Sequence, residues 1–271
     1  MQENEPAFLT FINQIILNQF NNSMKASISL LLLFVLMAGR TASAAPKIIL
    51  KLDDLYASKG VCPCAKTFDL LIQKQVKAGF GIVAGRLDDT TAETLKPYMD
   101  AVNQKGEKLF EIWHHGFDHV NPEFKGTPYE YQKAHFEDAD RLVKNLLGLQ
   151  MHTFGTPFNG SDENTNRVVA ENPHYKVFMF SNVVPSAPTG ILYLNNRVNL
   201  ENGVANPDFE YFRDNYLKAK DRYSDFMILQ AHPNNWPPEK LDQFSQVLDF
   251  LLAEGCEFVL PYEYYESTVK K

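Results

Sequence analysis

Several features that assign proteins to common classes are missing from this sequence. The 271 residues carry a formal net charge of −7 and contain no basic cluster, which argues against binding to nucleic acid or to an anionic membrane surface. There is no G-x-S-x-G turn and no glycine-rich phosphate loop, so a serine hydrolase of that type and a P-loop enzyme are not indicated. Internal repeats and low-complexity linkers are absent as well.

Long hydrophobic runs are also lacking. The apolar stretch from Ala26 to Gly39 has about 14 residues, whereas a membrane span needs about 20. It follows Met24-Lys25 and precedes Ala42-Ser43-Ala44, small residues at the spacing that a signal peptidase reads. We therefore expect an N-terminal extension, a start at Met24 and a secretory signal at about 24–44, cleaved after Ala44. An uncleaved amphipathic anchor that also uses Phe8 to Leu17 is the alternative.

Cleavage would leave residues 45–271 as a single domain with a sizeable core. The segment removed contains two acidic and two basic residues, so the mature chain would keep its net charge of −7. The prediction is an exported protein, periplasmic or secreted, with no stable membrane span after cleavage and no nucleic-acid partner.

Cysteine is scarce, and the three residues are Cys62, Cys64 and Cys256. An exported protein can form a disulfide. Cys62 and Cys64 are badly placed to bridge each other, because only Pro63 separates them. We therefore expect one of them to pair with Cys256. A thiolate metal site is not favoured, since a fourth soft ligand is missing.

Strand-like and helix-like runs alternate along the mature chain. We expect strands at 47–52, 81–84, 108–113, 152–154, 177–181, 191–198, 225–231 and 256–261, and helices at 67–78, 91–105, 129–147, 209–220 and 238–253. This alternation is typical of an α/β chain with a parallel sheet or barrel, in which chemistry collects at the carboxyl ends of the strands.

Histidine is concentrated in one segment. His115 and His119 stand four residues apart, and His114 directly precedes them. Neutral imidazole is the commonest protein ligand for divalent transition metals, and an i, i+4 pair can close on one ion from a helix or a tight loop. Gly116 and the strand-like residues before the pair favour a loop at a strand end. A catalytic zinc needs about three protein ligands and an open position for water, so a carboxylate should complete the site.

Polar residues follow four of the predicted strands. Besides the histidines, these are Asp53-Asp54, the segment Gly155 to Asn159, and Gln230-Ala-His232. One aspartate can complete the metal site while the other acts as a general base on water, because neighbouring residues cannot face the metal with the same geometry. His232 could protonate a leaving amine or alkoxide. The residues therefore predict hydrolysis of an amide or ester carbonyl that the metal polarises.

These residues resemble the motifs of the polysaccharide deacetylase family, the NodB-homology domain of carbohydrate esterase family 4. Leu52-Asp-Asp-Leu55 is similar to the first motif, whose first aspartate is the base and whose second binds the metal. His115-Gly-Phe-Asp-His119 matches the spacing of the H-x-x-x-H metal motif. Leu229-Gln-Ala-His232 is similar to the last motif, which carries the acid histidine.

The resemblance implies a fold, a cofactor and a set of roles. The fold would be a distorted (β/α)7 barrel, and the cofactor one divalent metal ion, usually zinc and sometimes cobalt or nickel. Asp53 would be the base and His232 the acid. The metal ligands would be Asp54, His115 and His119.

Two departures from the family pattern indicate a divergent branch. Gly116 stands where the family usually has serine or threonine. Gly155-Thr-Pro-Phe158 replaces an R-x-P-Y motif, so the arginine that orients the base is missing. Arg86 or Arg197 could supply that charge from elsewhere in the chain.

Three residues are expected to contact the substrate. Pro157 and Phe158 keep the groove-wall character of the third motif. The aspartate–tryptophan pair of the fourth motif cannot be placed in the sequence, but Trp236, which follows His232, could form a wall that faces the sugar.

The main prediction is an exported hydrolase that uses metal-activated water to remove acetyl groups from N- or O-acetylated glycans. A catalytically weak carbohydrate-binding protein that retains the fold is one alternative, favoured by the loss of the arginine. A metal amidohydrolase acting on a non-sugar amide is another.

Overall fold

A computed structural model describes residues 45–57 and 61–269 of the chain. The predicted N-terminal extension, the start at Met24 and the secretory signal at about 24–44 lie outside the described residues. Within them, no helix combines the length and the apolar composition needed to cross a membrane.

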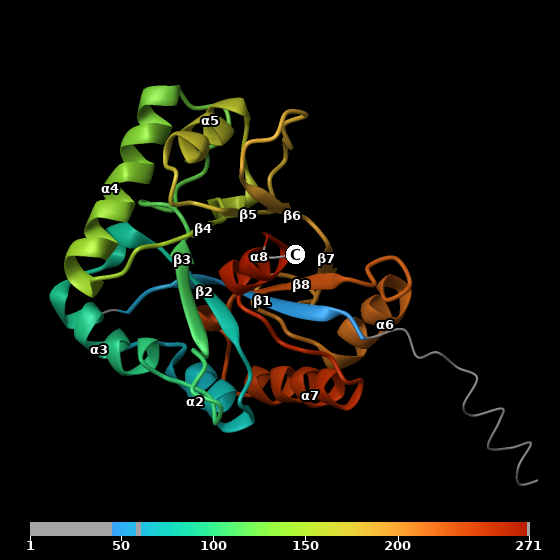
Figure 1. Cartoon of the computed structure of the whole chain (residues 1–271). Coiled ribbons are helices and arrows are strands. Elements are labelled where there is room, and N and C mark those ends of the chain that lie inside the picture. Colours follow the sequence, from blue (N-terminus) through green and yellow to red (C-terminus); the bar gives the residue numbers. More distant parts are fainter. Residues whose placement is uncertain (1–44, 58–60, 270–271) are drawn as a thin grey trace, which may run out of the picture. The chain divides into compact units, whose positions relative to one another are not determined.

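The described strands form one curled sheet in which every pairing is parallel (Figure 1). Its order is β6-β5-β4-β3-β2-β1-β8-β7. The strands are β1 (Lys47–Leu55), β2 (Ala78–Ile82), β3 (Phe110–His114), β4 (Thr153–Phe154), β5 (Val177–Met179), β6 (Leu192–Leu194), β7 (Arg197–Asn199) and β8 (Phe226–Ala231). The predicted fold class, a distorted (β/α)7 barrel, is confirmed.

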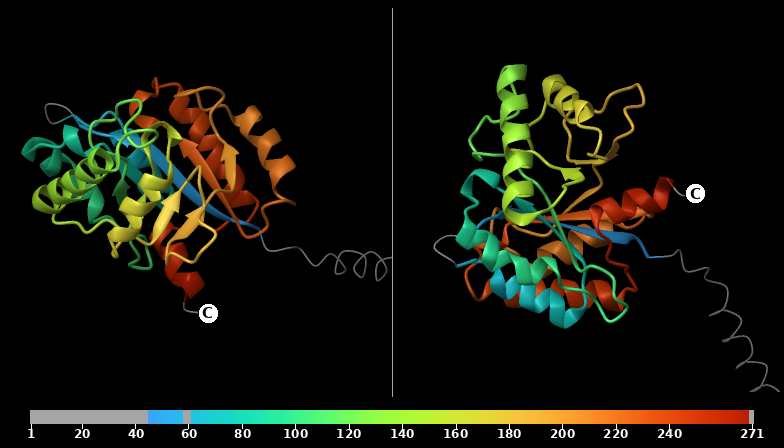
Figure 2. Two further views of the ribbon diagram at one scale, coloured as in Figure 1. Left: turned by 90° about the horizontal axis from the view of Figure 1, so that it is seen from above. Right: turned by 60° about the vertical axis from the view of Figure 1, so that its left-hand side comes forward.

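Helices surround the sheet on its outer side (Figures 1 and 2). They are α2 (Ala65–Lys74), α3 (Asp89–Met99), α4 (Tyr129–Leu147), α5 (Glu163–Glu171), α6 (Phe209–Ala219) and α7 (Lys240–Ala253). Short 3₁₀ turns follow three strands: η1 (Ala84–Arg86), η2 (Pro157–Asn159) and η3 (Pro233–Asn235). A last helix, α8 (Pro261–Val269), lies within the curve of the sheet (Figure 1).

Two apolar cores hold these layers together. The larger one lies between the sheet and the outer helices and includes Leu50, Phe80 and Phe136. The smaller one lies inside the curve, where Ile49 and Trp113 pack together with side chains of α8. Successive residues of β1 thus face opposite cores, as the alternation of a strand requires.

Glycine on β2 makes room for the indole ring of Trp113. A Cβ atom at Gly81 would lie 2.3 Å from Cη2 of Trp113, and a Cβ at Gly79 would lie 3.0 Å from Cδ1. A side chain at either position would displace the ring, since real contacts are longer. The fully buried indole in turn forms part of the surface on which Lys51 rests, with the ammonium 4.8 Å from the ring centroid.

Most predicted elements are present with shifted ends. Helix α4 has the predicted bounds, because Gly148 adopts a left-handed φ of 69° and ends it. No helix is predicted where α5 forms, although a capping box between Asp162 and Thr165 marks its start.

Two predicted strands are wrong. The segment 191–198 divides into β6 and β7, which lie on opposite edges of the sheet. The segment 256–261 forms an isolated bridge between Ile48 and Phe258, and the chain then turns into α8. Both segments are apolar enough for a strand, but local pattern does not specify which strand a segment meets.

The predicted disulfide is also wrong, since all three cysteines are free and buried. Cys62 and Cys64 follow the carboxyl end of β1, with sulfur atoms 2.8 Å apart. Cys256 lies beside the amino end of β1, where Ile48 bonds to the next residue, Glu257. Its thiol instead contacts the Tyr216 hydroxyl at 3.5 Å. The length of β1 therefore separates the cysteines that were expected to pair.

Candidate metal centre and active site

The site begins with a bulge near the end of β1. The pairing with β2 is regular to Leu52 and then shifts before Leu55, so the bulge accommodates one extra residue. Asp54 occupies the left-handed region with φ of 62°. Because of this kink, the carboxylates of Asp53 and Asp54 face the same site, which neighbouring residues of a regular strand could not do.

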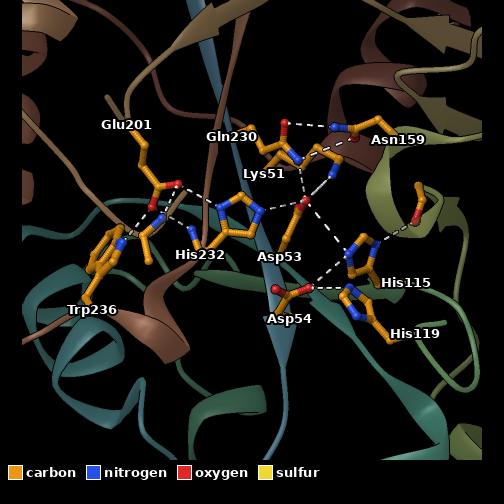
Figure 3. A network of polar contacts seen from close by, with 12 residues as sticks. Lys51, Asp53, Asp54, His115, His119, Asn159, Glu201, Gln230, His232 and Trp236 are labelled. Atoms are coloured by element: carbon orange, nitrogen blue, oxygen red, sulfur yellow. Dashed lines mark hydrogen bonds and ion pairs between the residues drawn. The ribbon is translucent and has the colours of Figure 1, made fainter. Parts of the chain in front are cut away.

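Asp54 meets two histidines from the loop after β3 (Figure 3). Its Oδ1 lies 2.8 Å from Nε2 of His119 and 3.3 Å from Nε2 of His115. The three potential ligand atoms all lie within 4.8 Å of one another. We call these three residues the metal-ligand cluster.

The chemistry of this cluster fits a divalent cation. Nδ1 of His115 lies 2.7 Å from the carbonyl oxygen of Gly155, which requires an N–H at Nδ1 and leaves a lone pair on Nε2. That lone pair faces Oδ1 of Asp54, a buried oxygen without a hydrogen-bond partner among the described residues. A bound metal ion would resolve this contact, and two imidazoles with one carboxylate make a three-ligand set suited to zinc.

A buried glutamate shapes the loop that carries His119. Glu123, 2% exposed, accepts hydrogen bonds from the backbone N–H groups of Phe117 at 2.6 Å and His119 at 2.8 Å. These bonds hold His119 at a left-handed φ of 58°. Gly116 is confined at the same point, because a Cβ there would lie 2.6 Å from Cγ of Pro157. The serine or threonine usual in the family would clash in this loop.

Asp53 points into the barrel and is held by two side chains (Figure 3). Lys51, which is fully buried, donates to both carboxylate oxygens at 2.7 Å, and Gln230 donates to Oδ2 at 2.5 Å. Burial alone would raise the pKa of Asp53, but the charges of Lys51, His115 and His232 outweigh it and hold that pKa below its usual value. Asp53 is therefore a carboxylate at neutral pH.

His232 approaches Asp53 from the side opposite the metal-ligand cluster, with Nε2 3.9 Å from Oδ2 of Asp53. Its Nδ1 lies 2.7 Å from Oε2 of Glu201, and the indole N–H of Trp236 donates to Oε1 of the same glutamate at 2.6 Å. Burial lowers the pKa of His232, yet the hydrogen bond to Glu201 and the charges of Asp53 and Glu201 raise it overall. His232 can therefore hold a proton near neutral pH.

A cavity of about 290 Å³ connects these groups. The residues that line it are Asp53, Asp54, His115, His119, Phe158, Asn159, Arg197, Val204, Gln230 and His232. Seven non-glycine residues of the described chain have a positive φ, and four of them line this cavity. Such conformations are costly and cluster at functional sites.

The three residues expected to contact substrate lie in different places. Phe158 lines the cavity, is 55% exposed and has its ring centroid 4.7 Å from that of His119. Pro157 is buried against Gly116. Trp236 is not among the residues that line the cavity, because its ring packs against Phe244 and its N–H is used by Glu201.

The sequence also drew attention to His114, Arg86 and Arg197, which make other contacts in the fold. His114 is buried on the outer side of the sheet, stacked on Phe136, and burial lowers its pKa to about 4. The guanidinium of Arg86 lies over the ring of Tyr56. Arg197 lines the cavity, but the cation that binds Asp53 is Lys51.

Lys51, Glu123 and Glu201 are site residues that the sequence analysis missed. Lys51 had a usable signal, since it precedes Asp53 by two residues on a strand and must share its face. A lysine within an otherwise apolar strand therefore marks a buried charge that needs a partner. Glu201 gives no such signal, because it lies 31 residues from His232 in the sequence.

One protein-family model matches about half of the chain. The model of the family described as polysaccharide deacetylase matches residues 41–177. No curated protein shows significant similarity to the sequence.

Solved structures at low identity share the fold. The family 4 domain of a multidomain xylanase from the hindgut metagenome of Trinervitermes trinervoides is 18% identical, with a TM-score of 0.59 over 82% of this chain and 91% of that one. A family 4 acetyl xylan esterase from Clostridium thermocellum, solved with cobalt, is 17% identical, with a TM-score of 0.59 over 81% and 91%. A family 4 pseudoenzyme from Bacillus anthracis is 11% identical, with a TM-score of 0.58 over 82% and 66%.

The ion pair between Lys51 and Asp53 makes a testable contribution to stability. In Lys51→Met the carboxylate of Asp53 would stay buried without its cation, and breaking a buried pair costs about 3–5 kcal/mol. We expect the free energy of unfolding in urea at pH 7 to fall by about that amount. The double variant Lys51→Met/Asp53→Leu should recover much of the loss, since no unpaired charge remains.

Lys47→Met is the matched control on the same strand. Lys47 pairs with Glu257 at 3.3 Å with both side chains partly exposed, so its loss should cost less than about 1 kcal/mol. Equal losses for Lys47→Met and Lys51→Met would contradict the special role of the buried pair.

Proposed function

The chain belongs to the polysaccharide deacetylase family and is a deacetylase-like hydrolase, and on that premise we propose that it removes acetyl groups from N- or O-acetylated glycans with the help of one divalent metal ion. The observation that carries this proposal is the convergence of three kinds of group on one cavity. These are the metal-ligand cluster, the carboxylate of Asp53 and the imidazole of His232.

Asp54, His115 and His119 would hold the metal ion, for which zinc is the first candidate and cobalt or nickel are alternatives. When bound, such an ion polarises a carbonyl and lowers the pKa of water. The acetyl xylan esterase that shares this fold was solved with cobalt, which supports a metal-dependent reaction here.

Asp53 is suited to the role of general base. It is held as a carboxylate by Lys51 and lies close to the metal-ligand cluster, with Oδ2 3.8 Å from Nε2 of His115. Lys51 and Gln230 donate hydrogen bonds to the carboxylate of Asp53 and fix its orientation. Lys51 thus supplies the positive charge that the missing third-motif arginine would otherwise provide, although it comes from a different strand. The presence of Lys51 in place of the arginine supports an active enzyme over a weak binding protein.

His232 is suited to the role of general acid. Glu201 accepts from Nδ1, which leaves Nε2 facing the cavity with a proton to donate to the departing amine or alkoxide. Glu201 itself is oriented by Trp236 and by the backbone N–H of His232. In this arrangement Trp236 acts as a positioning residue for the acid.

Glycans are the substrate class that the related proteins favour. The structures of similar fold include the acetyl xylan esterase and a peptidoglycan deacetylase from Bacillus subtilis, which is 13% identical with a TM-score of 0.56. Export by the predicted signal at about 24–44, leaving residues 45–271 as the mature catalytic domain, would place the protein where such polymers occur.

Acetate release tests the proposal. Purified protein is incubated with a panel of N- and O-acetylated oligosaccharides, after treatment with chelator and after addition of zinc. We expect acetate from at least one glycan, its loss on chelation and its return with zinc. His119→Ala should lose both bound zinc and activity, because a ligand in a three-residue site cannot be replaced without a large loss of affinity.

His174→Ala is the control for the histidine variant, because His174 pairs with Asp140 away from the cavity. It should keep zinc and activity. Acetate release that resists chelation, or full zinc content in His119→Ala, would contradict the assignment. Specific glycan binding without acetate release would point to a binding protein instead.

The pH profile tests the role of Glu201. A raised pKa keeps His232 protonated to higher pH, so the general acid stays active on the alkaline side. Glu201→Gln removes the hydrogen bond and the charge that raise this pKa, so the alkaline limb of kcat should move to lower pH and the rate loss should be larger at pH 8 than at pH 6. Glu210→Gln, an exposed change on α6, should leave the profile in place. An unshifted alkaline limb in Glu201→Gln would exclude His232 as the group that titrates there.

A further inference from the structure

A line of positive charge leads away from the proposed active site. We propose that it binds carboxylate groups on the sugars next to the acetylated one, so that the substrate is an acidic glycan. The acetyl part of this inference rests on the proposed function, whereas the carboxylate part rests on the cavities and charges described below.

Three cavities adjoin along β7 and α6. The first is the 290 Å³ cavity at the metal-ligand cluster, and the second and third measure about 220 Å³ and 210 Å³. Residues shared by the first and second are Arg197, Val204, Gln230 and His232. Arg197 and Asn199 line both the second and the third. Arg197 therefore belongs to all three cavities, which we together call the cationic groove.

The acidic groups near the start of the groove are already neutralised. Asp53 is bound by Lys51, and Glu201 is bound by His232. Asp54 belongs to the metal-ligand cluster. None of the described residues that line the third cavity is acidic.

The cations of the groove have no such partners. Within residues 45–57 and 61–269, no carboxylate forms an ion pair with Arg197, Lys218 or Arg222. Arg197 also acts on Lys51 as a like charge. The chain as a whole has a net charge of −7, so three cations without paired carboxylates along one groove contrast with its overall charge. The groove therefore has an excess of positive charge that an anionic ligand would balance.

Neutral donors accompany these cations. The side-chain nitrogen of Asn215, which lines the third cavity, is buried and has no hydrogen-bond partner among the described residues. Asn199 and Tyr211 line the second cavity and contact each other at 3.4 Å. Amide and hydroxyl groups of this kind suit sugar hydroxyls, so the groove combines donors for a sugar with cations for its charge.

Arg197 is the residue best placed to select a carboxylate. Its guanidinium lies over the ring of Phe180, 5.4 Å from the centroid, which restricts the orientation of the fork. A planar guanidinium can bind both oxygens of one carboxylate, and such charge-assisted pairs are stronger than neutral hydrogen bonds. Lys218 lies in the last turn of α6, and Arg222 follows the end of that helix. Both line the third cavity, where a second acidic sugar could reach them.

Binding measurements on matched oligosaccharides test the proposal without requiring turnover. One pair is an oligosaccharide of alternating N-acetylhexosamine and uronic acid, and the same molecule with its carboxylates reduced to alcohols. A second pair carries the carboxylate on an ether substituent of the amino sugar instead of on the ring. We expect the purified protein to bind at least one acidic member about 5- to 10-fold more tightly than its reduced partner. The preference should shrink as salt rises from about 0.05 M to 0.5 M.

Charge variants assign the preference to the groove. In Arg197→Gln the ratio of the two affinities should fall towards one, and Lys218→Gln should lower it by a smaller factor. Lys220→Gln is the matched control, because Lys220 is an exposed lysine at the end of α6 that lines none of the three cavities. The Lys220→Gln variant should bind the acidic and the reduced oligosaccharides with unchanged affinities.

Three outcomes would overturn the proposal. They are equal affinity for the acidic and reduced members of both pairs, no binding of either acidic oligosaccharide, or a preference that Arg197→Gln leaves intact. Acetate release is scored separately, so a protein that prefers the acidic member but releases no acetate would refute the proposed function and not the groove.

Discussion

The ion pair between Lys51 and Asp53 is the interaction on which the rest of the site depends. A carboxylate this deep in a barrel would be protonated without a neighbouring cation, because desolvation favours the neutral acid. Lys51 provides that cation, and the aromatic faces of Trp113 and Phe180 lie 4.8 Å and 5.3 Å from its ammonium. Gly81 leaves the space that Trp113 fills. The charged state of Asp53 therefore depends on the packing of Trp113 against Gly81, because Trp113 supports Lys51.

A backbone constraint divides the work between the two aspartates. In a regular strand Asp53 and Asp54 would face opposite sides of the sheet, and only one could reach the cavity. The bulge and the left-handed conformation of Asp54 turn the second carboxylate towards the histidines, while Asp53 keeps the inward direction that brings it to Lys51. The loop that contains Gly116 and His119 is held in place differently, by hydrogen bonds from its backbone N–H groups to the buried carboxylate of Glu123.

The sequence analysis could predict what periodicity and spacing encode. The parallel strands, helix α4, and the histidine pair with its neighbouring aspartates all follow from such local patterns. The disulfide, the undivided strand at 191–198 and the strand at 256–261 failed because each depends on which distant segments meet. Glu201 was missed for the same reason, since its link to His232 exists only in the folded chain.

The loss of a motif residue does not mean that its charge is lost from the site. The third motif has lost its arginine, which favoured a weak binding protein on sequence grounds. In the fold, the positive charge beside Asp53 comes from Lys51 on β1, two residues away on the same face. Arg197, the candidate closer to the cavity, is free for a different ligand.

The division of roles between the two aspartates is the central claim, and zinc content measured together with acetate release tests it most directly. Asp54→Asn should lose bound zinc, because it removes one of three ligands. Asp53→Asn should keep its zinc and lose about 100-fold or more in rate, as expected for a missing general base. Equal loss of zinc in the two variants, or an Asp53→Asn protein that keeps its full rate, would contradict the account.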